Sequence, residues 1–169
     1  GSLVALRPTE TPLVFLDMDG VLVNEPGVWQ GYKLPKGSQT GIGKRINRLA
    51  VAELNRITDA SGAQIVISST WRYLFPDFIE TWLKQAGMTG VIVGKTPDFR
   101  MDPREGPTSE NRGAQITMWP AKNNHTGPYV VLDDADTAGE GHKDKFVQCR
   151  FYSGLTSERA DKAIAILTA

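Results

Sequence analysis

The chain has 169 residues, of which 40% are hydrophobic and 22% are charged. This composition predicts one globular domain with a sizeable core and excludes a disordered or fibrous protein. Nineteen basic and nineteen acidic residues balance each other, so the chain lacks the overall positive field that attracts nucleic acid without sequence preference. Binding of a nucleic-acid partner would therefore require a local patch of basic residues.

The cysteine content and the hydropathy pattern indicate the cellular compartment in which the protein works. Cys149 is the single cysteine, which excludes an internal disulfide framework and predicts a buried thiol with no disulfide-linked partner. No apolar run approaches the roughly 18 residues that span a bilayer, and the N-terminus lacks the layout of a signal peptide. We expect a cytoplasmic protein without a membrane partner. Gly1-Ser2 resembles a cloning remnant, so the domain prediction covers residues 3–169, and the chain is compatible with being one part of a longer protein.

Short apolar runs alternate with segments of helical period along the chain. The runs predict strands at 13–16, 64–67, 91–93, 129–132 and 146–151. The helical spacing predicts helices at 42–60, 75–86 and 109–119, the last ended by Pro120, and a terminal helix capped by Thr156. Residues 24–41 are rich in Gly and Pro and predict a flap without regular structure. This alternation predicts an α/β sandwich with right-handed crossovers.

Polar residues follow three of the predicted strands. Asp17 and Asp19 follow the first run and precede Gly20, which allows a turn at low steric cost. If the backbone stays extended, these two carboxylates share one face. Ligands bind beyond the carboxyl ends of the strands in such a sheet. We therefore expect three polar clusters to converge at one edge: Asp17 with Asp19, Ser68 with Ser69, and Asp133 with Asp134.

Such a constellation predicts phosphoryl-transfer chemistry. Several carboxylates at one edge repel each other unless a cation lies among them, and oxygen ligands favour Mg²⁺ completed by a substrate phosphate. One Asp can attack phosphorus while a second carboxyl protonates the leaving oxygen and then activates water. Asp17 and Asp19 suit this division of roles. Ser68 and Arg112 would hold the equatorial phosphoryl oxygens.

The ordered motifs resemble those of the haloacid dehalogenase (HAD) superfamily of phosphohydrolases. The order is Asp17-x-Asp19-Gly20, then Ser68, then Arg112, then Asp133-Asp134. Residues 68–72, 112–116, 132–134 and 154–156 are similar to the HAD domains of the Swiss Army knife RNA-repair proteins, and the resemblance covers about residues 13–167. It implies a Rossmann-like three-layer α/β sandwich with a five-stranded parallel sheet in the order 3-2-1-4-5. Many relatives carry a large cap domain, but the insert at residues 24–41 is short here, so we expect a minimal cap. The resemblance also implies a phosphoric monoester hydrolase that works through an aspartyl-phosphate.

The resemblance assigns roles to individual residues. It implies Asp17 as nucleophile and metal ligand, Asp19 as general acid/base, and Ser68 and Arg112 as phosphate-binding groups. Ser68 is preferred over Ser69 because it comes first after the apolar run. The candidate metal ligands are Asp17, Asp19, Asp133 and Asp134, and the doublet at 133–134 leaves open which of its two residues binds the ion.

Two further pairs of residues leave alternatives open. Trp71 and Arg72 form either a platform and phosphate clamp for a nucleotide end or a packed aromatic with a structural ion pair. His125 and His142 lie in polar loop sequence and are expected to be solvated bystanders.

The leading functional hypothesis is a Mg²⁺-dependent phosphohydrolase that removes terminal phosphates from nucleic-acid ends in RNA repair. Its partner would be a phosphorylated substrate, for which a nucleic-acid end is the leading candidate. Residues 17–21 also resemble deoxyribonucleotidase openings, so a phosphatase of nucleotides or small molecules is the second hypothesis. The third is a non-catalytic module that binds phosphate or nucleic acid within a larger assembly.

Overall fold

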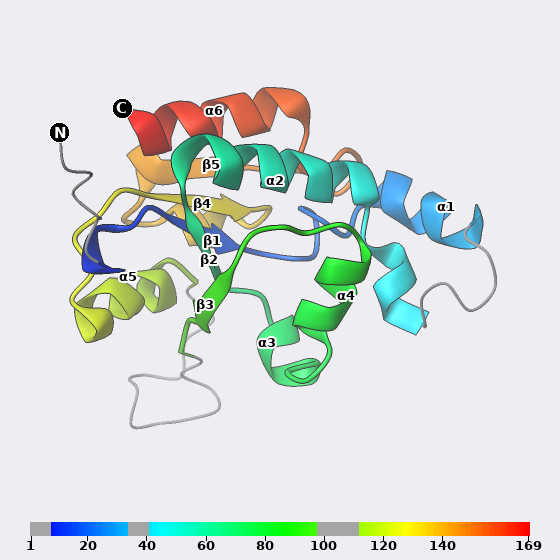
Figure 1. Cartoon of the computed structure of the whole chain (residues 1–169), viewed down its shortest axis with the longest axis horizontal. Helices are drawn as coiled ribbons and strands as arrows, with labels where there is room; N and C mark the ends of the chain where they lie inside the picture. Colours follow the sequence, from blue (N-terminus) through cyan, green and yellow to red (C-terminus); the bar gives the residue numbers. More distant parts are fainter. Residues whose placement is uncertain (1–7, 34–40, 98–111) are drawn as a thin grey trace, which may run out of the picture.

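Five parallel strands form the central sheet, in the order β3-β2-β1-β4-β5. This computed structural model describes residues 8–33, 41–97 and 112–169. The order confirms the predicted Rossmann-like sheet, and helices flank it on both sides (Figure 1). The strands are β1 (Leu13–Leu16), β2 (Gln64–Ile67), β3 (Ile92–Lys95), β4 (Tyr129–Asp133) and β5 (Phe146–Gln148).

The central strand β1 is buried along its whole length. It pairs in parallel with β2 and β4, with Leu16 opposite both Ile67 and Leu132. A strand covered on both faces is apolar at every position, which explains the continuous run in the sequence. This central position places Asp17, the residue that follows β1, in the middle of the carboxyl edge.

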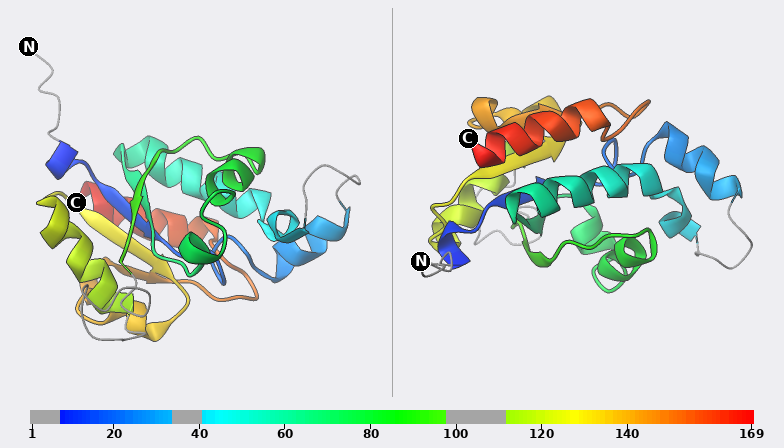
Figure 2. Two further views of the ribbon diagram at one scale, coloured as in Figure 1. Left: turned by 90° about the horizontal axis from the view of Figure 1, so that it is seen from below. Right: turned by 45° about the horizontal axis from the view of Figure 1, so that its top comes forward.

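The helices pack as two layers (Figures 1 and 2). Alternate residues of a strand point to opposite faces, so Leu16 contributes to the larger core and Phe15 to the smaller one. The larger core is covered by α2 (Arg48–Ser61) and α6 (Ser157–Thr168), and the smaller by α5 (Arg112–Asn123). The α5 face is the one that carries the polar site. The remaining elements are α1 (Glu25–Lys33), α3 (Trp71–Leu74), α4 (Ile79–Gln85) and short 3-10 turns at Pro8–Glu10, Gly41–Arg45, Asp136–Gly139 and Lys143–Lys145.

The helix predicted over 42–60 begins later than expected. Gly41–Arg45 is a 3-10 turn, and α2 starts at Arg48 because the Asn47 side chain accepts hydrogen bonds from the Leu49 and Ala50 amides. Leu49, which the helical period places on the apolar face, is 76% exposed. The terminal helix agrees with its prediction, since Thr156 caps α6 through the Arg159 amide.

The predicted flap at 24–41 contains a helix, α1, so the loop prediction was wrong for Glu25–Lys33. Asn24 Oδ1 accepts from the Gly27 amide at 3.0 Å and so caps the first turn. Pro26 is tolerated there because the first turn needs no amide donor. The rest of the flap, residues 34–40, lies outside the described residues.

The helix predicted over 75–86 is shorter than expected, because only α4 (Ile79–Gln85) lies within that span, and the separate helix α3 precedes it. Phe75 leaves the helical conformation and Pro76 follows it, so the helix begins only at Ile79. Phe78 is 54% exposed and stacks on Trp82 with ring centroids 5.5 Å apart.

Two element ends were also misplaced. The helix expected to end before Pro120 continues through it to Asn123, since a proline removes one helical hydrogen bond without forcing a stop. The last strand ends at Gln148 rather than at residue 151, because the chain turns at 151–153.

Candidate active site

Neighbouring strands present one polar residue each at the carboxyl edge, in a single row across the sheet. Asp17 donates its amide to Leu132 O, Ser68 to Leu16 O, and Thr96 to Ile67 O, all at 2.9–3.0 Å. These bonds extend the parallel ladder by one residue beyond the strands. In the order β3, β2, β1, β4 and β5, the strands therefore contribute to this row the residues Thr96, Ser68, Asp17, Asp133 and Gln148.

Asp17, Asp133 and Asp134 form a compact acidic cluster beside α5. One oxygen from each lies within 4.8 Å of the others. Asp17 and Asp133 are buried, and Asp134 is half-buried. Burial and then the charge of Asp133 raise the pKa of Asp17 well above its usual range, and burial also raises the pKa of Asp134. The convergence expected for these residues is thus present.

Gly20 makes room for Asp134 in this cluster. Its φ is +82°, a conformation that side chains rarely adopt, and an added Cβ would collide with the Asp134 carboxylate. The sequence suggested Gly20 only as a turn residue. The close approach to Asp134 gives this glycine a second steric role.

Arg112 bridges two of the carboxylates from the first turn of α5. Its Nη1 lies 3.0 Å from Asp17 Oδ1 and 3.1 Å from Asp133 Oδ2. The Ala135 amide donates to the other Asp133 oxygen at 2.9 Å. Among the described residues, Arg112 is the one cation that the ion pairs give to these three carboxylates, which leaves an excess of negative charge in this part of the structure. The donor set, entirely of carboxylate oxygens, suits a hard divalent cation.

Asp19 lies apart from this cluster. The chain turns after Asp17, with three successive amides, those of residues 21–23, donating to Met18 O. Asp19 is consequently exposed, and it does not belong to the group of carboxylates that converge within 4.8 Å. Its Oδ2 accepts a hydrogen bond from the Trp71 indole at 3.2 Å. Trp71 is buried and packs edge-on against Phe75 and Trp82.

The two candidate serines differ in their surroundings. Ser69 Oγ accepts a hydrogen bond at 3.2 Å from the amide of Trp71, the first residue of α3. Ser68 Oγ is fully buried and has no hydrogen-bond partner among the described residues. Buried hydroxyls without a partner are rare because they lose hydration without compensation. Ser68 is therefore the better candidate for contact with a ligand.

Arg72 uses all of its donors within the protein. Its Nε donates to Thr96 O, and its two terminal nitrogens donate to the carbonyls of Ser68, Ser69 and Pro97 and to Gln115 Oε1. The five N–H groups of a guanidinium are thereby occupied. Arg72 thus holds the ends of β2 and β3 together through carbonyl acceptors, and its role as a phosphate-binding group stays a prediction.

His142 is buried, so the expectation that it is solvated was wrong. Its Nε2 lies 2.9 Å from Gly113 O, and its Nδ1 lies 2.6 Å from Tyr129 Oη. A carbonyl only accepts, so Nε2 carries the proton and Nδ1 accepts from the tyrosine. His142 thus fastens α5, and with it Arg112, to the sheet. His125 is half-buried and contacts Thr11 O at 2.7 Å.

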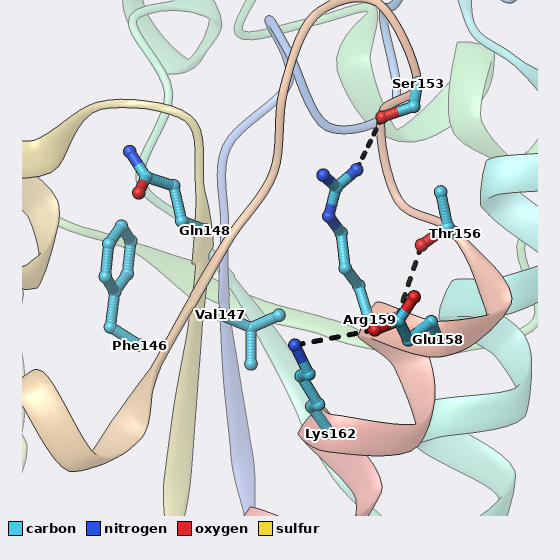
Figure 3. A pocket seen from close by; sticks show the side chains of 8 residues that line it. All are labelled: Phe146, Val147, Gln148, Ser153, Thr156, Glu158, Arg159 and Lys162. Carbon is cyan, nitrogen blue, oxygen red and sulfur yellow. Dashed lines mark hydrogen bonds and ion pairs between the residues drawn. The ribbon is translucent and has the colours of Figure 1, made fainter.

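A cavity of about 370 Å³ opens between β5 and α6 (Figure 3). In it the Arg159 side chain reaches up to Ser153 Oγ, and Lys162 points toward Glu158. None of its lining residues belongs to the acidic cluster. Its size alone therefore does not make it the reactive site.

Cys149, the residue after β5, is a free thiol inside the core. Burial raises its pKa to about 12, so this thiol is not activated as a thiolate by its surroundings. In the part of the chain that the structure describes, no helix has the length and hydropathy needed to cross a membrane.

A family model described as "HAD domain in Swiss Army Knife RNA repair proteins" matches residues 13–160. The chain therefore belongs to this family of HAD domains, which confirms the resemblance inferred from the motifs. Family membership supports a general assignment as a hydrolase of phosphorylated substrates. Comparisons with curated proteins and with solved structures found no match.

One residue of the site and one contact in it were not anticipated. Thr96 directly follows a strand, as Ser68 does, and the same positional rule would have found it if the third strand had been extended to Lys95. The contact between Trp71 and Asp19 joins positions 52 residues apart. No local pattern in the sequence indicates that contact.

Proposed function

We propose that this protein is a Mg²⁺-dependent phosphoric monoester hydrolase that works through an aspartyl-phosphate on Asp17. The observation that carries the proposal is the row at the carboxyl edge. There a buried Asp17 lies between the unpartnered Ser68 hydroxyl and Asp133, with Arg112 spanning the two carboxylates. This set combines a nucleophile, a hydroxyl and a cation around one position, as phosphoryl transfer requires.

Asp17, Asp133 and Asp134 would hold the cation, since one oxygen from each lies within 4.8 Å of the others. When bound, Mg²⁺ would neutralise charge on the substrate phosphate and on the cluster. The raised pKa of Asp17 supports this assignment, because a buried carboxylate with acidic neighbours stays ionised only when positive charge compensates it.

Asp17 would attack phosphorus, and the ester bond to the leaving oxygen would break while Asp19 gives that oxygen a proton. Met18 N and Arg112 Nη1 both contact Asp17 Oδ1, so we assign the attack to Oδ2. A water molecule would then attack phosphorus as Asp19 takes its proton, and the bond between phosphorus and Asp17 would break. The products are the free alcohol and inorganic phosphate. The exposure of Asp19 suits a group that meets the leaving oxygen and water.

The test is Mg²⁺-dependent release of phosphate from p-nitrophenyl phosphate by wild type, Asp17→Asn and Ser68→Ala. We expect Asp17→Asn to abolish turnover and Ser68→Ala to reduce kcat by about 10²–10³-fold. Ser69→Ala is the matched control, because the Ser69 hydroxyl already accepts a hydrogen bond from the Trp71 amide. Full activity of Asp17→Asn would refute the mechanism.

For the natural substrate we propose the terminal phosphate of a nucleic-acid end, in keeping with the RNA-repair context in the family's description. The second candidate is a free mononucleotide. Comparing kcat/KM for a phosphorylated oligonucleotide and the corresponding mononucleotide separates the two. A preference for the mononucleotide would favour nucleotidase activity.

A further inference from the structure

Thr96 has the same combination of features that marks Ser68 as a ligand-binding residue. Its side chain is fully buried, and its Oγ1 is the other buried side-chain oxygen or nitrogen without a hydrogen-bond partner in the described structure. An unpaired buried hydroxyl costs free energy that a bound group could recover. Both hydroxyls are therefore candidates for hydrogen bonds to a bound ligand.

The two hydroxyls lie side by side. Ile67 pairs with Lys95 in the sheet, so the next residues, Ser68 and Thr96, occupy adjacent positions of the row. Gly94, two residues before Thr96, faces Trp119 of α5, so Thr96 points to the α5 face, as Asp17 does. Adjacent strands are about 4.8 Å apart, which places Thr96 about 10 Å from the backbone of Asp17.

Arg72 holds the backbone of Ser68 and Thr96 in place. It donates to the carbonyls of Ser68 and Thr96, and Tyr73 Oη also donates to Thr96 O at 3.3 Å. The backbone of both strand ends is therefore held, and the hydroxyls keep their positions without bonds of their own. Such preorganisation is typical of binding groups.

We propose that Thr96 is a substrate-binding residue. Ser68 would contact the reacting phosphate, and Thr96, one strand farther from Asp17, would hydrogen-bond a polar group of the substrate about one strand spacing from that phosphate. This inference rests on the proposed function and extends it to substrate selection. A phosphorylated sugar, as at a nucleic-acid end, carries ring, hydroxyl or phosphate oxygens at that separation. In p-nitrophenyl phosphate, ring carbons lie at that separation, and the nitro oxygens are farther away. Thr96 would thus favour phosphorylated sugars over aryl phosphates.

The test compares Thr96→Val, Thr96→Ser and Ser68→Ala. For binding, the probes are inorganic phosphate and an oligonucleotide with a terminal, non-hydrolysable methylenephosphonate, titrated by calorimetry with Mg²⁺. We expect Thr96→Val to weaken oligonucleotide binding about 3–10-fold and to leave phosphate binding unchanged. Ser68→Ala should weaken both, and Thr96→Ser should retain wild-type affinity. For turnover, kcat/KM of Thr96→Val should fall on the phosphorylated oligonucleotide but not on p-nitrophenyl phosphate.

Thermal unfolding distinguishes binding from a structural role. Removing an unpaired buried hydroxyl should raise the Tm of Thr96→Val by about 2–4 °C. Thr58→Val is the control, since that buried hydroxyl donates to Asn55 O and its loss should lower the Tm. Four outcomes would overturn the proposal. They are a lowered Tm for Thr96→Val, equal losses of affinity for the two probes in that variant, no loss of affinity for either probe, and no binding of the oligonucleotide by wild type. Wild type that binds but does not hydrolyse would refute the proposed function alone.

Discussion

The Trp71 indole donates a hydrogen bond to Asp19 Oδ2 across 3.2 Å, and so links α3 to the turn after β1. Trp71 is itself held by its edge-on contacts with Phe75 and Trp82. An exposed carboxylate would otherwise sample several rotamers, so this bond restricts the orientation of the proposed acid. We therefore expect Trp71 to act as a positioning residue.

Replacing Trp71 by Phe removes the donor and keeps an aromatic ring in the cluster. We expect kcat/KM to fall about 10–100-fold on alkyl phosphates, because a hydrogen bond to a charged group is lost. The decrease should be smaller on p-nitrophenyl phosphate, whose leaving oxygen needs little protonation. Steady-state kinetics on both substrates measure the difference. Trp82→Phe changes the same aromatic cluster and serves as the control. Equal losses on the two substrates would indicate a structural role only.

The acidic cluster predicts how stability depends on pH without divalent metal. Below about pH 3.8, the ordinary pKa, Asp17 and Asp134 are protonated in both the folded and the unfolded chain. Above it the unfolded chain releases protons that the folded chain retains, because both folded pKa values are raised. The free energy of unfolding therefore falls as pH rises from 3.8 through the raised values.

Urea unfolding across this range, with EDTA or with Mg²⁺, measures the effect. Asp134→Asn should lose less stability than wild type as the pH rises in EDTA, and Mg²⁺ should remove most of the wild-type decrease. A wild-type protein that gains stability relative to Asp134→Asn with rising pH in EDTA would contradict the raised pKa.

Arg112 contacts both Asp17 and Asp133 through one atom, Nη1. A single ammonium group can therefore replace it, and we expect Arg112→Lys to retain much more activity than Arg112→Met. The uncharged variant should lose about 10²–10³-fold in kcat, since it leaves the phosphoryl oxygens without a cation. Phosphate release assays on the two variants provide the comparison. Similar activities would show that the charge at this position is dispensable.

Gly20 and Gly62 allow a matched test of steric crowding in the site. Both have positive φ, but only at Gly20 would a Cβ collide with Asp134, whereas Gly62 has open space. Gly62→Ala should lower stability by about 1 kcal/mol through backbone strain alone. Gly20→Ala should lower it further and also weaken Mg²⁺ binding. Thermal unfolding with and without Mg²⁺ tests this, and equal effects of the two changes would contradict the role of Gly20.

The sequence by itself determined the sheet and the position of the acidic residues. Continuous apolar runs identify buried parallel strands, and a residue that follows such a strand must lie at the carboxyl edge. For this reason the order of residues along the chain is enough to place Asp17, Ser68 and Asp133 together. The helices were predicted less accurately, and α1 was missed altogether because the local signal of the Asn24 cap competed with the turn-rich composition around it.

Only the tertiary structure decided what each polar residue does. Arg72, Ser69 and His142 all bear groups capable of catalysis or binding, but each is occupied by partners within the fold. Ser68 and Thr96 are left without partners at neighbouring strand ends among the described residues. A hydroxyl or guanidinium has the same chemistry in every sequence, and whether it is available depends on acceptors brought near it from distant parts of the chain.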